Sequence, residues 1–147
     1  MSHKSAKIAA LIAGCQGQAL DAHYLGYFEC FNAGRFYEAH DVLEELWLAD
    51  RRGPHGDFYK GLIQFAGAFV HLQKDRLRPA AALFGLARGN LAKYAPWHQH
   101  LDLARLLVTA GEWIERLEKA DYTRNPLTPD SAPRLALEPG AERHPPP

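Results

Sequence analysis

From Leu20 to Ala120, apolar residues recur every three or four positions, and no stretch alternates apolar and polar residues as a strand does. This period places the apolar side chains on one face of a helix. Because the connections between the helical stretches are short, neighbouring helices are expected to be antiparallel. The chain is therefore predicted to be all-α, a compact bundle of about five helices, at about residues 20–32, 35–50, 57–75, 79–94 and 99–119.

Residues that start or stop helices flank these segments. Gly34 follows the first segment and can adopt the left-handed conformation that ends a helix. Asp57 is a suitable N-cap for the third segment. Pro79 suits the first turn of the fourth segment, and Pro96 ends that segment.

The two ends of the chain differ in composition from the helical domain, which is assigned to residues 19–120. Residues 1–18 are predicted to form a short helix or to be disordered. Seven of the ten prolines fall between Pro126 and Pro147. Proline lacks a backbone donor and blocks helices, and this stretch has few large apolar residues to bury. Residues 121–147 are therefore predicted to be a disordered, proline-rich tail.

The sequence Ile12-Ala13-Gly14-Cys15 resembles a bacterial lipoprotein cleavage box. The apolar stretch before it is at the lower limit of length for a signal peptide, so the protein is predicted to be cytoplasmic. The alternative is a lipoprotein anchored through Cys15. No apolar run approaches the roughly 18 residues of a membrane-spanning helix, and no membrane span is predicted.

The composition excludes several classes of protein. The 147 residues are 47% hydrophobic, which is enough for a core. Lys and Arg number 17 and so do Asp and Glu, and this zero net charge disfavours general nucleic-acid binding. Cys15 and Cys30 are too few for a disulfide framework or a four-thiolate zinc site, and Cys30 is interpreted as a core residue.

The second segment combines an apolar face with polar residues at the edge of that face. His40 lies at this edge and Glu44 lies beside it, since residues four apart are neighbours on a helix. Glu38, Asp41 and Glu45 point the other way as an acidic stripe. We interpret this stripe as a solvated face, which could also meet a basic partner.

The third segment is apolar nearly all round, as a central helix is. Gln64 and His71 share a narrow stripe with Gly61 and Ala68, whose small side chains would let another helix approach closely. Buried polar groups need hydrogen-bond partners, and the nearest candidates in sequence lie on the preceding segment. We therefore predict a polar cluster between the second and third segments, made of His40, Glu44, Gln64 and His71.

This polar cluster has three interpretations. It can be a hydrogen-bonded network that fixes the register of two helices. It can line a pocket for a small polar ligand. It can also be a metal or acid–base site, in which His40, Glu44 and His71 hold a divalent metal and Gln64 orients a water. The chain has neither a His-Glu-x-x-His motif nor a Glu-x-x-His pair to support this third interpretation.

Other chemistry-bearing residues give weaker patterns. His98 and His100 follow Pro96, and we interpret them as solvated residues at the start of a helix. No Gly-Lys-Ser/Thr loop is present to bind phosphate, and no serine lies in a nucleophile-elbow setting.

The stretch from Phe31 to Trp47 begins Phe-Asn-Ala-Gly and continues as Glu-Ala-His-Asp-Val-Leu-Glu-Glu-Leu-Trp, and Gly-Leu-Ile-Gln and a histidine follow it. This combination resembles the domain of unknown function 309 family over about residues 28–94. The resemblance implies a small helical protein from a prokaryote and no established activity. The chain departs from the family where Lys74-Asp75-Arg76-Leu77-Arg78 replaces the usual Gly-Asn. The residues that match the motif are Glu38, His40, Glu44, Trp47, Gly61, Gln64 and His71.

The sequence thus predicts an uncharacterised, non-catalytic helical module that binds a partner or a small ligand around the polar cluster. The alternative is a metal-dependent, hydrolase-like enzyme that uses His40, Glu44 and His71. No cofactor is predicted apart from the divalent metal of this alternative. The aromatic residues of the first segment are compatible with a homodimer or a protein partner, and also with a core.

Overall fold

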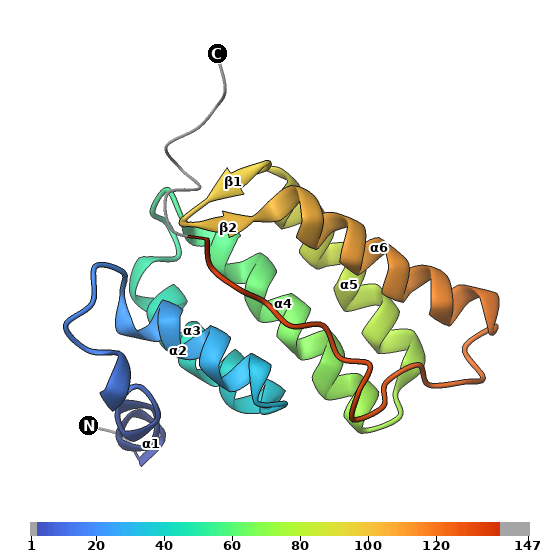
Figure 1. Ribbon diagram of the computed structural model, residues 1–147, viewed down its shortest axis with the longest axis horizontal. Coiled ribbons are helices and arrows are strands. Elements are labelled where there is room, and N and C mark those ends of the chain that lie inside the picture. Colours follow the sequence, from blue (N-terminus) through green and yellow to red (C-terminus); the bar gives the residue numbers. More distant parts are fainter. Residues whose placement is uncertain (1–2, 139–147) are drawn as a thin grey trace.

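The computed structural model describes residues 3–138, and the described part is a bundle of helices with one small hairpin (Figure 1). Six α-helices are present in these residues: α1 (His3–Leu11), α2 (Ala22–Asn32), α3 (Phe36–Asp50), α4 (Gly56–Gln73), α5 (Leu77–Ala92) and α6 (Leu103–Lys119). A short 3-10 helix, η1 (Ala13–Cys15), follows α1. The predicted all-α fold is confirmed, but the helices number six rather than five.

The core forms because α2 to α6 pack in chain order, each against the next. Helix α4 lies in the middle and is buried on most of its surface, as its nearly continuous apolar sequence predicts. Rings from five helices meet in the core. Phe69 on α4 contacts the rings of Phe31, Phe36, Phe65, Phe84 and Trp113.

Helix α1, which is additional to the five predicted helices, lies against α3 and η1. It forms where the sequence allowed either a short helix or disorder. Ile8 on this helix and Ile12 just after it are each 2% exposed, so their burial holds the N-terminal helix on the bundle.

Two predicted helix starts differ from the structure. Asp57 lies in the first turn of α4 instead of capping it, and its carboxylate accepts a hydrogen bond from Lys93 Nζ at 2.7 Å. The last helix begins at Leu103 rather than near residue 99, because β1 (Trp97–His98) and β2 (Leu101–Asp102) form an antiparallel hairpin. The Asp102 side chain then caps α6 by accepting from the Arg105 backbone N–H at 2.9 Å.

Residues 121–138 have no helix or strand and run back along the bundle to the hairpin (Figure 1). Asn125 Nδ2 donates to Leu72 O at 2.6 Å, and Glu138 N donates to His100 O at 2.7 Å. Leu135 is buried between these two anchors. The sequence predicts disorder from residue 121 onward, but these apolar and amide side chains find partners on the bundle. Residues 139–147 of the predicted tail lie outside the described residues.

Within residues 3–138, no helix has both the length and the apolar character needed to cross a membrane.

Candidate functional site

Three of the four predicted cluster residues line one hollow of about 200 Å³ between α3, α4 and α5, which we call the α4 hollow. His40 comes from α3, whereas Gln64 and His71 come from α4. Glu44 does not line the α4 hollow and lies beside His40 instead. The remaining lining residues are mainly apolar: Tyr37, Ile63, Gly67, Val70 and Leu83.

Gly67 keeps the α4 hollow open, because a Cβ at this position would lie 3.2 Å from Leu83 Cδ1 and 4.0 Å from His40 Cδ2. Gly61, six positions earlier on α4, instead allows a neighbouring helix to pack closely. A Cβ there would lie 2.7 Å from Leu91 Cγ, so the glycine lets α5 approach α4. The helix that packs closely against the small residues of α4 is therefore α5.

Gln64 is oriented by α5 rather than by the predicted partners on α3. Its side-chain oxygen accepts a hydrogen bond of 2.8 Å from Asn90 Nδ2. Asn90 follows Leu83 by seven positions on α5, so both residues face α4. This helical spacing is a signal that could have identified Asn90 from the sequence.

Among the residues that line the α4 hollow, His71 has a polar ring atom that makes no hydrogen bond to the described residues. Its ring Nδ1 is buried and has no hydrogen-bond partner within the described part of the chain. Burial lowers the pKa of His71, and the positive charges of Arg76 and Lys74 lower it further. The ring is therefore neutral at pH 7, and one of its nitrogens is a lone-pair acceptor.

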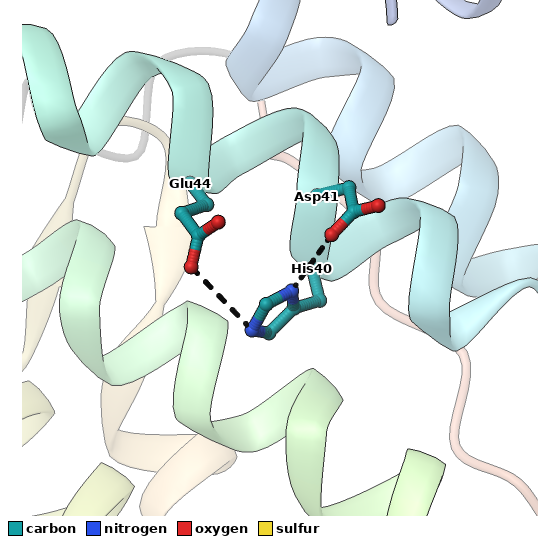
Figure 2. A group of neighbouring side chains, drawn as sticks. All are labelled: His40, Asp41 and Glu44. Carbon is teal, nitrogen blue, oxygen red and sulfur yellow. Dashed lines mark hydrogen bonds and ion pairs between the residues drawn. The ribbon is translucent and has the colours of Figure 1, made fainter. Parts of the chain in front are cut away.

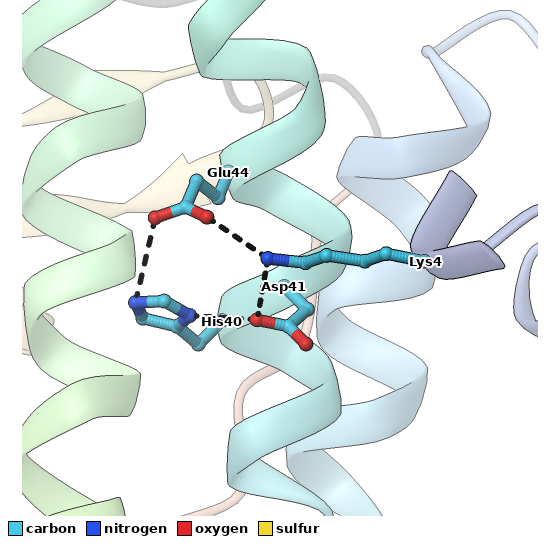
Figure 3. Close-up of polar contacts among 4 residues, drawn as sticks. All are labelled: Lys4, His40, Asp41 and Glu44. Carbon is cyan, nitrogen blue, oxygen red and sulfur yellow. Dashed lines mark hydrogen bonds and ion pairs between the residues drawn. The ribbon is translucent and has the colours of Figure 1, made fainter. Parts of the chain in front are cut away.

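On the other side of His40, α3 carries a compact ionic group (Figure 2). His40 Nδ1 lies 3.2 Å from Asp41 Oδ1, and His40 Nε2 lies 3.9 Å from Glu44 Oε2. Lys4 reaches from α1 to the same group, with Nζ 3.4 Å from Asp41 Oδ1 and 3.2 Å from Glu44 Oε1 (Figure 3). We call these four residues the Lys4 network.

The Lys4 network joins one ammonium to two carboxylates. Burial alone would lower the pKa of Lys4, but its contacts with Glu44 and Asp41 outweigh burial and raise that pKa. The ammonium therefore stays charged and offsets part of the negative charge of the two carboxylates. This network ties α1 to α3.

The residues predicted for the metal alternative are not gathered around one point. Among the described residues, the group whose ligand atoms lie within 4.8 Å of one another is His40, Asp41 and Glu44. His71 is not part of this group, and Lys4 already supplies a positive charge to both carboxylates. The arrangement thus resembles an ion-pair network more than a metal centre.

Glu38, Asp41 and Glu45, interpreted as a solvated face that could also meet a basic partner, are partly exposed and paired with basic residues. Each carboxylate has a basic partner from this chain: Arg35 Nη2 at 3.1 Å for Glu38, Lys4 for Asp41, and His23 Nε2 at 2.9 Å for Glu45. Asp41 and Glu45 have partners because α1 and α2 lie against this side of α3, whereas Arg35 lies three positions before Glu38. Sequence reasoning missed Lys4 because nothing in its local pattern shows that α1 returns to α3.

Trp47, the last residue of the helical motif, is half-buried and packs against the core. The two cysteines are both buried and free. Burial and a hydrogen bond to Glu29 raise the pKa of Cys15 to about 11, and burial raises the pKa of Cys30. Both are therefore thiols with little nucleophilic character at neutral pH.

Comparison with known proteins gives one match. A family model described as Domain of unknown function (DUF309) matches residues 24–93, which run from α2 to the residue after α5. No curated protein and no solved structure matches the chain. The matched stretch includes His40, Glu44, Gln64 and His71, so the resemblance seen in the motif is confirmed. Over residues 24–93, which carry the candidate site, the chain is therefore similar to the DUF309 family.

Proposed function

We propose that this chain is a non-catalytic module that binds a small ligand in the α4 hollow. The observation that carries the proposal is the buried Nδ1 of His71, which has no partner among the described residues although this residue lines a hollow. An unsatisfied buried polar atom costs about 1–3 kcal/mol, and a hydrogen bond from a ligand or a ligand-held water would remove that cost.

The size and chemistry of the hollow limit the ligand. A volume of about 200 Å³ is smaller than the roughly 300–1,000 Å³ of pockets for drug-sized molecules. Ile63, Val70 and Leu83 favour an apolar body, whereas Gln64 and His71 favour one polar end. Because His71 is neutral at pH 7, we infer a small uncharged molecule with a hydroxyl or amide group.

A binding role fits these residues better than the metal-dependent alternative. That alternative needs His40, Glu44 and His71 around one ion, and Glu44 instead meets Lys4 at the far side of His40. No arrangement of the described side chains favours the enzyme. Elemental analysis of purified protein, with thermal melts in chelator, separates the two. We expect substoichiometric metal and a melting temperature that the chelator does not change. Near-stoichiometric metal that is lost in His40→Ala would instead support the enzyme.

The binding proposal is tested by NMR titration with phenol as a neutral probe and benzoate as a charged one. We expect phenol to give saturable shifts at the side chains of His40, Gln64 and His71, and benzoate to bind about tenfold more weakly because a neutral site does not repay desolvation of its charge.

Gly67→Ala provides the matched variant, since its methyl group occupies space between Leu83 and His40. We expect this variant to bind phenol at least about tenfold more weakly, which is the effect of about 1.4 kcal/mol. Gly89→Ala on α5 is the control, because a Cβ there meets nothing within 4 Å. Equal phenol binding by wild type and Gly67→Ala would refute the proposal.

A further inference from the structure

The C-terminal segment is held to the bundle through its backbone at two positions. The side-chain amide of Asn32 on α2 donates from Nδ2 to Leu135 O at 2.7 Å, and its Oδ1 accepts from Leu135 N at 2.8 Å. In the turn between β1 and β2, His100 O accepts from Glu138 N at 2.7 Å, and His100 Nδ1 lies 3.3 Å from Glu138 O. An amide that pairs with both backbone groups of one residue holds an extended chain as a neighbouring strand would, whatever the side chain of that residue.

The side chains of this stretch alternate in burial. Leu135 is buried and Leu137 is partly buried against the core, whereas the side chains of Ala136 and Glu138 are exposed. Every second side chain of an extended chain points the same way, so the two leucines face the bundle. Residues 134–138 form no helix or strand of their own. Their arrangement is that of an extended peptide bound in a groove.

This groove lies between α2 and the start of α6, and we call it the α2–α6 groove. Leu25 and Phe28 of α2 line a hollow of about 660 Å³ beside the segment. Leu101 of β2 and Leu106 of α6 line a second hollow, of about 410 Å³. Leu135 borders both hollows, so the segment leaves space unfilled toward α2 and toward α6. The groove therefore has room for larger side chains than this segment carries.

Charges on the walls of the groove complement those of the segment. Arg134 borders both hollows, whose walls carry the carboxylates of Glu29 on α2 and Asp102 on β2. Glu138 borders the second hollow, whose wall also carries the guanidinium of Arg105 on α6. Complementary charges fix the direction in which a chain binds. The groove thus suits an extended peptide with a basic residue, two alternate leucines and an acidic residue, in that order.

The α2 wall of the groove and its occupant come from different regions of the chain. Asn32 belongs to the Phe-Asn-Ala-Gly stretch of the motif, and it lies with Leu25 and Phe28 inside residues 24–93, which match the family model. The C-terminal segment lies outside that match and returns to the groove after α6 (Figure 1). The segment is thus attached to the groove as a tethered ligand is, and a separate peptide of the same chemistry would compete with it.

We propose that the α2–α6 groove binds an extended peptide of a partner protein, and that residues 134–138 occupy the groove as a tethered competitor. Tethering gives the segment an effective concentration on the order of millimolar, so a free peptide of the same sequence must reach this range to displace half of it. A partner peptide whose larger side chains fill the two hollows displaces it at lower concentrations. The groove is separate from the α4 hollow, and its peptide does not depend on a ligand there.

Fluorescence anisotropy with a labelled peptide of residues 131–138, blocked at both ends, tests the groove on the full chain. The variant Leu135→Asp frees the groove, because a carboxylate is costly to bury at this position. We expect this variant to bind the peptide at least about tenfold more tightly than wild type, in which the tethered segment competes. Val108→Asp adds the same charge at an exposed position of α6 and should bind as wild type does. Equal binding by Leu135→Asp and wild type would overturn the proposal.

Two further changes separate recognition by the groove from unspecific apolar binding. Adding Asn32→Ala to Leu135→Asp removes the amide that pairs with the peptide backbone, and we expect about tenfold weaker binding than by Leu135→Asp alone. A peptide that itself carries Leu135→Asp should not bind the freed groove, because its carboxylate would replace the buried leucine. Unchanged affinity in either case would refute recognition by this groove.

An NMR titration of wild type does not depend on the folding of a variant. Unlabelled peptide at about 10 mM, above the effective concentration of a tethered segment, should displace the segment and shift the backbone amides of Leu135 and Glu138. Amides of α5, which does not line the two hollows, should stay in place. Unshifted amides at Leu135 would contradict displacement. A wild-type dimer that is lost in Leu135→Asp would place a second copy's segment in the groove and overturn the assignment to a partner.

Discussion

Lys4 and Glu44 are 40 positions apart in the sequence, yet Lys4 Nζ lies 3.2 Å from Glu44 Oε1. The same ammonium also lies 3.4 Å from Asp41 Oδ1. One side chain of α1 thus compensates both carboxylates that flank His40. The N-terminal helix is outside the family match but supplies a positive charge to the carboxylates inside it.

Lys4→Met should weaken the attachment of α1 while leaving the bundle folded. The Lys4 side chain is half exposed, so we expect a loss of less than about 1 kcal/mol in the free energy of unfolding. Urea denaturation measures this loss, which should vanish in about 1 M NaCl because salt screens surface charges. Lys7→Met on the same helix is the control. A loss that persists at high salt would mean that Lys4 acts through packing.

The partly buried ring of His71 predicts a pH dependence of stability. Burial lowers its pKa in the folded state, so below the unfolded pKa of about 6.5 the unfolded chain binds a proton that the folded chain does not. Stability should therefore fall as the pH drops from about 6.5 toward the folded pKa, and no penalty should exist above that window.

Urea midpoints at pH 7.5 and pH 5.0 check this prediction with His71→Gln. The variant should lose less stability between the two pH values than wild type does, since one titrating ring is gone. His3→Gln should match wild type, because this residue is exposed. An identical fall in wild type and His71→Gln would show that other groups cause the pH dependence.

Two of the three glycines of α4, Gly61 and Gly67, should respond differently to alanine. At Gly61 the new Cβ would lie 2.7 Å from Leu91 Cγ and 3.2 Å from Asn90 Cβ, so α5 must shift, at a cost of about 1–3 kcal/mol. At Gly67 the nearest atom is Leu83 Cδ1 at 3.2 Å, and the gain in helix propensity of up to about 1 kcal/mol offsets that contact. Urea denaturation of both variants should rank Gly67→Ala above Gly61→Ala, and the reverse order would contradict this packing.

Asn32 should control how firmly the C-terminal segment is held. Its side chain donates to Leu135 O at 2.7 Å and accepts from Leu135 N at 2.8 Å. Asn32→Ala removes both hydrogen bonds. If this lowers the stability of the docked segment by about 1.4 kcal/mol, trypsin should cut after Arg134 about tenfold faster. His3→Gln, at an exposed position of α1, is the control. Equal cutting rates in wild type and Asn32→Ala would show that Leu135 is held by other contacts.

The helices could be predicted from the sequence because their signals are local. The period of apolar residues and stop signals such as Gly34 predict α2 to α6 to within a few residues, apart from the start of α6. The hairpin was missed because its turn uses Gln99 and His100 at positive φ, where glycine or asparagine would have been the usual signal. Residues 97–102 therefore carry no strong turn pattern.

The candidate site could be predicted only in part. The stripe of Gln64 and His71 on α4 and the position of His40 on α3 follow from helical spacing, and these three residues do line one hollow. The partners from other elements, Lys4 and Asn90, depend on how helices far apart in sequence pack. Periodicity within one segment cannot give such contacts, so Glu44 was assigned to the wrong side of His40.

The contact between Asn32 and Leu135 joins positions 103 residues apart. Closing so long a loop has a high entropy cost unless the intervening chain is already compact. The helices between these residues must therefore assemble before the C-terminal segment can dock. We therefore expect the segment to dock late in folding, so that variants at Leu135 speed unfolding while leaving the folding rate nearly unchanged.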